Sequence, residues 1–158
     1  MRSALPFRSL SFHRLNSPRS EKKAMQLNKR RVLYVEDHED TRELITIVLR
    51  QRDFEVANAH TVDGGVRLAS EERFDLYLLD SWLPDGSGLD LCRRIRKFDQ
   101  VTPILFYSAA AYEADKNMAL SAGAQAYLIK PSQTSELCDL VSSLIDKANQ
   151  KASMGFSG

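Results

Sequence analysis

The feature that most constrains the fold is the uninterrupted apolar run Leu76–Leu79, which stops at the carboxylate of Asp80. A run this short and this apolar is typical of a strand buried on both faces, and such strands occur in parallel sheets that helices cover on both sides. The following residues include Pro84, Gly86 and Gly88, which end a strand and begin a loop. The run therefore predicts a parallel sheet with an acid at the carboxyl end of one strand.

The rest of the ordered sequence alternates short apolar runs with helical patterns. The other runs that predict strands are 32–35, 54–57, 103–107 and 124–129, and amphipathic patterns predict helices over 40–52, 61–73, 88–97, 111–122 and 133–148. Alternation of this kind favours an α/β fold, namely a flavodoxin-like doubly wound (βα)5 three-layer sandwich. With right-handed crossovers we expect a five-stranded parallel sheet in the order 2-1-3-4-5.

Length and composition exclude several classes of protein. The 158 residues suit one domain, and 43% hydrophobic with 27% charged residues is ordinary for a soluble globular protein. No apolar stretch is long enough for a membrane span. Cys92 and Cys138 lack metal-ligand spacing and fall in helical patterns, so we expect packing residues in a reduced, cytoplasmic protein.

Charge is distributed unevenly along the chain. Residues 1–31 hold nine Lys and Arg residues against the single acid Glu21, whereas the whole chain carries only +1, so the remainder is acidic. An acidic domain argues against nucleic-acid binding by residues 31–148. Residues 1–30 are predicted to form a basic, disordered extension, and residues 149–158 a flexible tail. An organellar transit peptide, or an upstream start codon with Met25 as the true start, are alternatives for residues 1–24.

Five polar side chains follow the predicted strands 1, 3, 4 and 5, and they are Glu36, Asp37, Asp80, Ser108 and Lys130. The strand order places the first three side by side at the carboxyl edge, where such sheets bind ligands. Crowded carboxylates stay ionised only if cations offset them, and oxygen ligands of this kind suit Mg²⁺. Together with an ammonium and a hydroxyl, they would surround a transferring phosphoryl group, with Asp80 as its acceptor.

These residues carry a resemblance to a known family. Glu36-Asp37, the segment Asp80-Ser81-Trp82-Leu83-Pro84-Asp85-Gly86, Ser108-Ala109 and Lys130-Pro131 occur in order at the predicted strand ends. The pattern is similar to the receiver domain of two-component response regulators, and it covers about residues 31 to 147. No single motif among them is specific, but their combination is.

The resemblance implies a role for each residue of the site. Asp80 would accept a phosphoryl group from the phosphohistidine of a histidine kinase. Asp37 and Asp80 would ligate Mg²⁺ through their side chains, the backbone carbonyl of Trp82 would add a ligand, and Glu36 would act through water. Lys130 would pair with the phosphoryl oxygens, aimed by a cis Lys130–Pro131 bond.

The resemblance also implies a switch and its partners. Ser108 would move toward the phosphoryl group, and Tyr127 would turn inward into the vacated space. Contacts would change over roughly residues 111–148. The chain would act as a single-domain receiver that catalyses only its own phosphorylation and dephosphorylation. Its partners would be a histidine kinase or a histidine phosphotransfer protein and a downstream protein.

Three alternatives can be compared with the sequence. A phosphatase with an aspartate nucleophile needs a second Asp two residues after the first, where this chain has Trp82. An FMN-binding flavodoxin needs a Ser- and Gly-rich loop after strand 1, but residues 36–40 contain four acids. A pseudo-receiver scaffold that is not phosphorylated would lack Asp80 or Lys130. In the receiver interpretation Trp82 departs from the commonest pattern, and we hypothesise that its indole shields the acyl phosphate from water.

Overall fold

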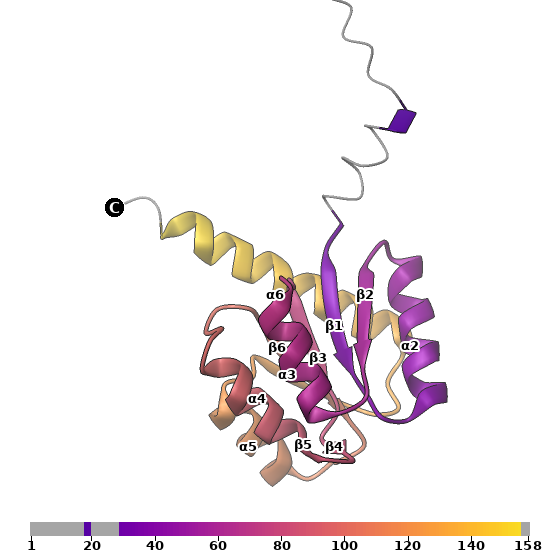
Figure 1. Cartoon of the computed structure of the whole chain (residues 1–158), viewed down its shortest axis with the longest axis vertical. Helices are drawn as coiled ribbons and strands as arrows, with labels where there is room; N and C mark the ends of the chain where they lie inside the picture. Colours follow the sequence, from indigo (N-terminus) through magenta and orange to yellow (C-terminus); the bar gives the residue numbers. More distant parts are fainter. Residues whose placement is uncertain (1–17, 20–28, 156–158) are drawn as a thin grey trace, which may run out of the picture.

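A five-stranded parallel sheet forms the centre of the molecule (Figure 1). The computed structural model describes residues 18–19 and 29–155. The strands of the sheet are β1 (Arg31–Val35), β2 (Glu55–Ala59), β3 (Leu76–Leu79), β6 (Ile104–Ser108) and β7 (Ala126–Ile129). Their order is β2-β1-β3-β6-β7. This is the predicted order 2-1-3-4-5 when only the strands of this sheet are counted, so the predicted fold is confirmed.

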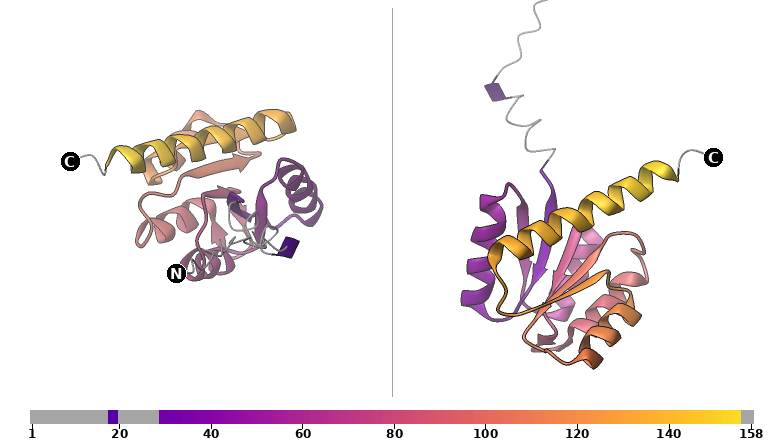
Figure 2. Two further views of the ribbon diagram at one scale, coloured as in Figure 1. Left: turned by 90° about the horizontal axis from the view of Figure 1, so that it is seen from above. Right: turned by 180° about the vertical axis from the view of Figure 1, so that it is seen from behind.

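Helices cover both faces of the sheet, which gives three layers (Figure 2). The helices are α2 (Glu39–Gln51), α3 (Val62–Glu71), α4 (Gly88–Arg96), α5 (Glu113–Ala122) and α6 (Thr134–Met154). Helices α3, α4 and α5 pack on one face, and α2 and α6 on the other. Polar residues begin two of these helices: the Thr61 hydroxyl caps α3 and the Ser87 hydroxyl caps α4.

Alternation along the strands divides the core into two clusters. In β1, Leu33 and Val35 pack beneath α3 and α4, whereas Val32 and Tyr34 pack beneath α2 and α6. Successive strand side chains point to opposite faces, so a strand covered on both sides must be apolar throughout. All four residues of β3 are buried, as the run Leu76–Leu79 predicts.

A small hairpin between β3 and α4 was not predicted. The segment 81–87 was expected to be a loop, but β4 (Trp82–Leu83) and β5 (Gly86–Ser87) pair in an antiparallel hairpin. Strands of two residues are too short for a period-2 pattern to indicate them. Pro84 and Asp85 form its turn, and both residue types favour turns.

The last helix is longer than its apolar pattern indicates. We expected it to end at Ala148, with a flexible tail after it, but α6 continues to Met154 and projects beyond the sheet (Figures 1 and 2). Residues 149–154 contain neither Gly nor Pro, so nothing stops the helix before Gly155. The prediction for residues 1–30 lies almost wholly outside the described residues. Among the residues described, no helix is both long and apolar enough to cross a membrane.

Candidate metal and phosphoacceptor site

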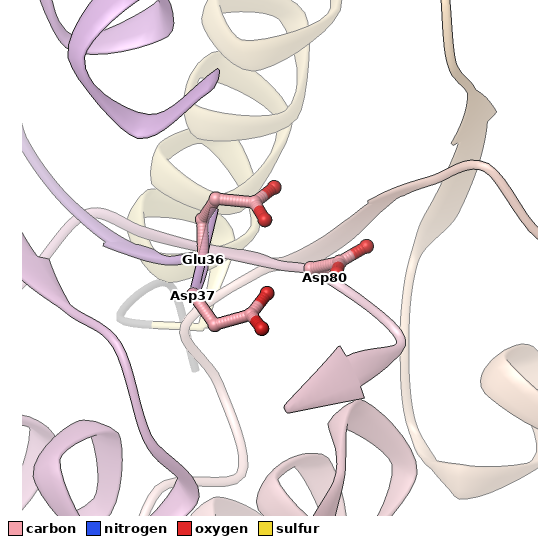
Figure 3. Close-up of side chains that lie close together, drawn as sticks. All are labelled: Glu36, Asp37 and Asp80. Carbon is pink, nitrogen blue, oxygen red and sulfur yellow. The ribbon is translucent and has the colours of Figure 1, made fainter. Parts of the chain in front are cut away.

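Three carboxylates meet at the carboxyl edge of the sheet. Glu36 and Asp37 directly follow β1 and Asp80 follows β3, and these strands are parallel neighbours in which Val35 lies opposite Leu79. Figure 3 shows the three side chains turned toward a common space. One oxygen from each carboxylate lies within 4.8 Å of the others. The predicted adjacency of the three acids is therefore present in the structure.

The three acids differ in exposure and in their partners. Glu36 is 1% exposed and Asp80 6%, whereas Asp37 is exposed. The Glu36 carboxylate accepts hydrogen bonds from the Tyr34 hydroxyl at 3.1 Å and from the His38 backbone N–H at 3.1 Å. Two donors and a cation thus hold Glu36, while Asp37 stands at the solvent side of the cluster.

The cation is Lys130, which follows β7. Its Nζ forms an ion pair with Glu36 Oε2 and lies 3.4 Å from Asp80 Oδ1. The ammonium also lies over the Tyr107 ring, 5.3 Å from its centroid. The Lys130–Pro131 peptide bond is cis, as the resemblance implies. Lys130 therefore contacts both buried acids and the face of the Tyr107 ring.

The electrostatics of Asp80 favour a bound cation. Burial raises the pKa of Asp80, Glu36 raises it further, and Lys130 offsets part of the shift. A raised pKa means that the folded protein disfavours the ionised form of Asp80. A second positive charge nearby would stabilise that form. Oxygen donors from two or three carboxylates suit Mg²⁺, which retains several waters and takes few protein ligands. The residues present therefore fit a magnesium ion.

The two predicted switch residues both contact Ala110. Ser108, at the end of β6, is fully buried, and its Oγ accepts a hydrogen bond from the Ala110 backbone N–H at 3.2 Å. The Tyr127 hydroxyl donates to the Ala110 carbonyl at 2.7 Å, and its ring stacks on Phe106 with centroids 5.9 Å apart. Ser108 and Tyr127 thus contact the same residue, Ala110, the first at its N–H and the second at its carbonyl.

The loop after Asp80 is held tightly. A Cβ on Gly88 would lie 2.1 Å from the Asp80 carbonyl oxygen, so only glycine permits this approach. The Gly88 N–H donates to the Ser81 carbonyl at 2.9 Å. The Asp85 carboxylate accepts hydrogen bonds from the Val62 and Asp63 backbone N–H groups at 2.7 and 3.0 Å, and so joins the hairpin to α3. The Trp82 side chain is 68% exposed.

The sequence pattern does not identify every residue of the site. It indicates that Tyr34 and Tyr107 are ordinary core residues of their strands, yet they contact Glu36 and Lys130 respectively. A phenol inside an apolar run was the available signal, because a buried hydroxyl requires a partner. His38 is exposed, and its ring caps α2 by accepting from the Thr41 N–H.

Comparison with known proteins identifies the family. The family model for the response regulator receiver domain matches residues 32–142. The chain belongs to this family.

Individual relatives agree with that result. Transcriptional regulatory protein ResD of Bacillus subtilis is 30% identical to this receiver chain over 125 residues, which cover 79% of this chain and 52% of ResD. The CheY-like receiver domain of Methanospirillum hungatei has a TM-score of 0.75 and 26% identity, covering 78% of this chain and 98% of that one. The chain spans about half the length of the curated relatives it matches first.

One solved structure bears on the metal. The receiver domain of the sensor histidine kinase PA1611 from Pseudomonas aeruginosa was solved with a magnesium ion coordinated in its active site cleft. It is 30% identical to this chain, with a TM-score of 0.70 and coverage of 75% of this chain and 98% of that one. The acidic cluster described above is compatible with such an ion.

Proposed function

We propose that this receiver domain takes a phosphoryl group from a phosphohistidine onto Asp80, with Mg²⁺, and thereby switches its contacts with other proteins. The observation that carries the proposal is the constellation around Asp80. This buried carboxylate has a raised pKa and lies 3.4 Å from the ammonium of Lys130. One of its oxygens also lies within 4.8 Å of an oxygen from each of two further acids. That arrangement supplies a nucleophile, a cation and metal ligands at one point.

The chemistry assigns one task to each residue. An Asp80 carboxylate oxygen would attack phosphorus, so that an O–P bond forms as the N–P bond to the donor imidazole breaks. Asp37 and Asp80, with the Trp82 backbone carbonyl, would hold Mg²⁺, and Glu36 would act on it through water. The bound ion supplies positive charge against the phosphoryl oxygens. Lys130, already directed at Asp80, would pair with one of those oxygens.

The switch follows from what Ser108 and Tyr127 now contact. If the Ser108 hydroxyl turned to a phosphoryl oxygen, it would give up the Ala110 N–H. Ala110, whose carbonyl accepts from Tyr127, would then be freer to move, and Tyr127 would move with it. The contact surface would then change over residues 111–148, which comprise α5, β7 and most of α6.

Partners follow from the same chemistry. The donor would be a histidine kinase or a histidine phosphotransfer protein, and the recipient of the signal another protein. We do not assign nucleic-acid binding to the receiver domain, which we place at residues 31–148. The chain would turn over only its own phosphoryl group.

A mass measurement tests the proposal. Purified protein is incubated with acetyl phosphate and Mg²⁺, and intact mass is compared with that of Asp80→Asn. We expect wild type to gain one phosphoryl group and the variant none, with the gain abolished by a chelator. A wild-type chain that gains no mass would favour the pseudo-receiver alternative. Continuous release of phosphate from many substrates would favour the phosphatase.

A second measurement tests the partner. Phosphorylated wild type and Asp80→Asn are each used as bait for a cognate kinase or a candidate downstream protein. Retention of that protein by one form only supports control by phosphorylation. Equal retention by both forms contradicts it.

A further inference from the structure

The hydroxyl of Tyr34 is a polar group placed deep in the core. Tyr34 is 0% exposed, and its ring packs in the cluster beneath α2 and α6. Tyr34 and Glu36 are two residues apart along the same strand direction, so their side chains share one face of the sheet. The phenol therefore extends from the core toward the site at the carboxyl edge of the sheet, where its hydroxyl donates to Glu36 Oε2 at 3.1 Å.

Glu36 in turn anchors Lys130. Oε2 of Glu36, the oxygen that accepts from Tyr34, is also the oxygen paired with Lys130 Nζ. The other oxygen, Oε1, accepts from the His38 N–H. Both carboxylate oxygens are thus engaged, and the side chain has little freedom to rotate. Glu36 is fixed as a counter-ion.

Lys130 depends on that anchor for its direction. Its Nζ contacts Glu36 more closely than Asp80, which lies at 3.4 Å, and its remaining support is the face of the Tyr107 ring. A lysine is a flexible four-carbon chain with a point charge, so its ammonium goes where its partners hold it. The position of Lys130 therefore rests on Glu36, and that of Glu36 on Tyr34.

We propose that the Tyr34 hydroxyl is a positioning group, which fixes Glu36 so that the Lys130 ammonium is directed at Asp80. The effect of Tyr34 on the position of Lys130 is inferred from the contacts above. The effect of that position on the rate of phosphorylation rests on the proposed function.

The chain offers a matched control for a role in stability alone. Tyr77 lies in the adjacent strand β3, is 1% exposed, and donates its hydroxyl to Asp99 Oδ2 at 2.8 Å. Like Tyr34 it is a buried phenol bonded to a carboxylate, but Asp99 precedes β6, at the opposite edge of the sheet. Tyr34→Phe and Tyr77→Phe each remove one oxygen atom and keep the ring, so both variants should fold.

The first readout needs neither metal nor phosphoryl donor. Lysine ammonium signals are recorded by ¹H–¹⁵N NMR on metal-free protein, and the Lys130 signal is assigned by its loss in Lys130→Arg. A held ammonium exchanges its protons slowly enough to be seen. We expect the Lys130 signal in wild type and Tyr77→Phe, and its broadening or loss in Tyr34→Phe. An unchanged signal in Tyr34→Phe, or no Lys130 signal in wild type, would overturn the proposal.

The second readout is the rate of phosphorylation by acetyl phosphate at saturating Mg²⁺. We expect Tyr34→Phe to slow it about tenfold, since a misplaced catalytic group loses rate without losing the site, and Tyr77→Phe to leave it unchanged. Equal slowing in both variants would show a general effect of stability and contradict the proposal. If wild type itself is not phosphorylated, the proposed function fails, and the ammonium signal still decides the role of Tyr34.

Discussion

Charged side chains gather at both edges of the central sheet, but those at the amino ends of the strands are paired, whereas at the carboxyl ends three acids lie near a single lysine. At the amino edge, the Arg31 guanidinium donates to Glu55 and Glu72 at 2.9 and 2.7 Å. Arg96 donates to the carbonyls of Thr102 and Gly123. At the carboxyl edge, three carboxylates lie close together, and Lys130 contacts two of them, Glu36 and Asp80.

The difference separates stability from function within one sheet. Asp99 at the amino edge accepts from the Val101 and Thr102 N–H groups and from the Tyr77 hydroxyl, which favour its ionised form. Asp80 at the carboxyl edge is buried beside another acid, which disfavours its ionised form. An acid with enough donors stabilises the fold, whereas an acid short of donors has affinity left for a cation or an electrophile.

The largest effect is expected from Asp80→Asn. The substitution removes the proposed nucleophile, so phosphorylation by acetyl phosphate should be lost entirely. It also removes a buried charge next to Glu36, so the melting temperature of the metal-free protein should rise. Calorimetry with and without Mg²⁺ measures both parts, because Mg²⁺ should stabilise wild type and not the variant. A variant less stable than wild type would contradict the repulsion at this edge.

Lys130→Met should have the next largest effect. Loss of a positioned cation opposite the reacting group reduces rates about 10²-fold in comparable sites. Glu36 would also lose its buried counter-ion, and breaking a buried ion pair in this way costs about 3–5 kcal/mol of unfolding free energy. Lys116→Met, on the surface of α5, is the control and should change neither quantity. Phosphorylation kinetics and urea denaturation check the prediction.

Arg96→Met, at the amino edge, should lower stability and leave phosphorylation unchanged. The guanidinium joins the loop before β6 to the loop before β7, and its loss leaves the carbonyls of Asp99 and Thr102 without the donor they have here. We expect a loss of about 2 kcal/mol in unfolding free energy, the usual size for a broken network, with phosphorylation unchanged. Arg93→Met, exposed on the same helix, is the control. Slower phosphorylation in a folded Arg96→Met protein would break the separation between the edges.

The two edges also differ in how far the sequence predicts them. Glu36, Asp37, Asp80 and Lys130 directly follow apolar runs, and the strand order then brings them together, so their adjacency could be predicted. Arg96 could not be identified in this way, because its carbonyl partner Gly123 is 27 residues away and a backbone acceptor carries no sequence signal. The hairpin at 82–87 was missed for its shortness, and the Asp85 contacts with α3 depend on where that hairpin lies.

The smallest effect, and the most direct comparison of the edges, is the pH dependence of Asp99→Asn against Asp80→Asn. Although burial opposes it, hydrogen bonds from Thr102, Tyr77 and Val101 lower the pKa of Asp99. Its ionised form therefore stabilises the fold above the unfolded pKa of about 3.9, and this contribution is lost as pH falls through the lower folded value.

Asp99→Asn should accordingly be less stable than wild type at pH 7, and the difference should shrink below about pH 4. Asp80 has a raised pKa, so its ionised form opposes folding at neutral pH. Asp80→Asn should be more stable than wild type at pH 7, and this difference too should shrink on acidification, but from a higher pH because the folded pKa is the raised one. Urea denaturation of the three proteins between pH 3 and 7 without divalent ions measures both curves. If both variants were less stable than wild type at pH 7, the ionised form of Asp80 would not oppose folding, and the contrast between the two edges would be contradicted.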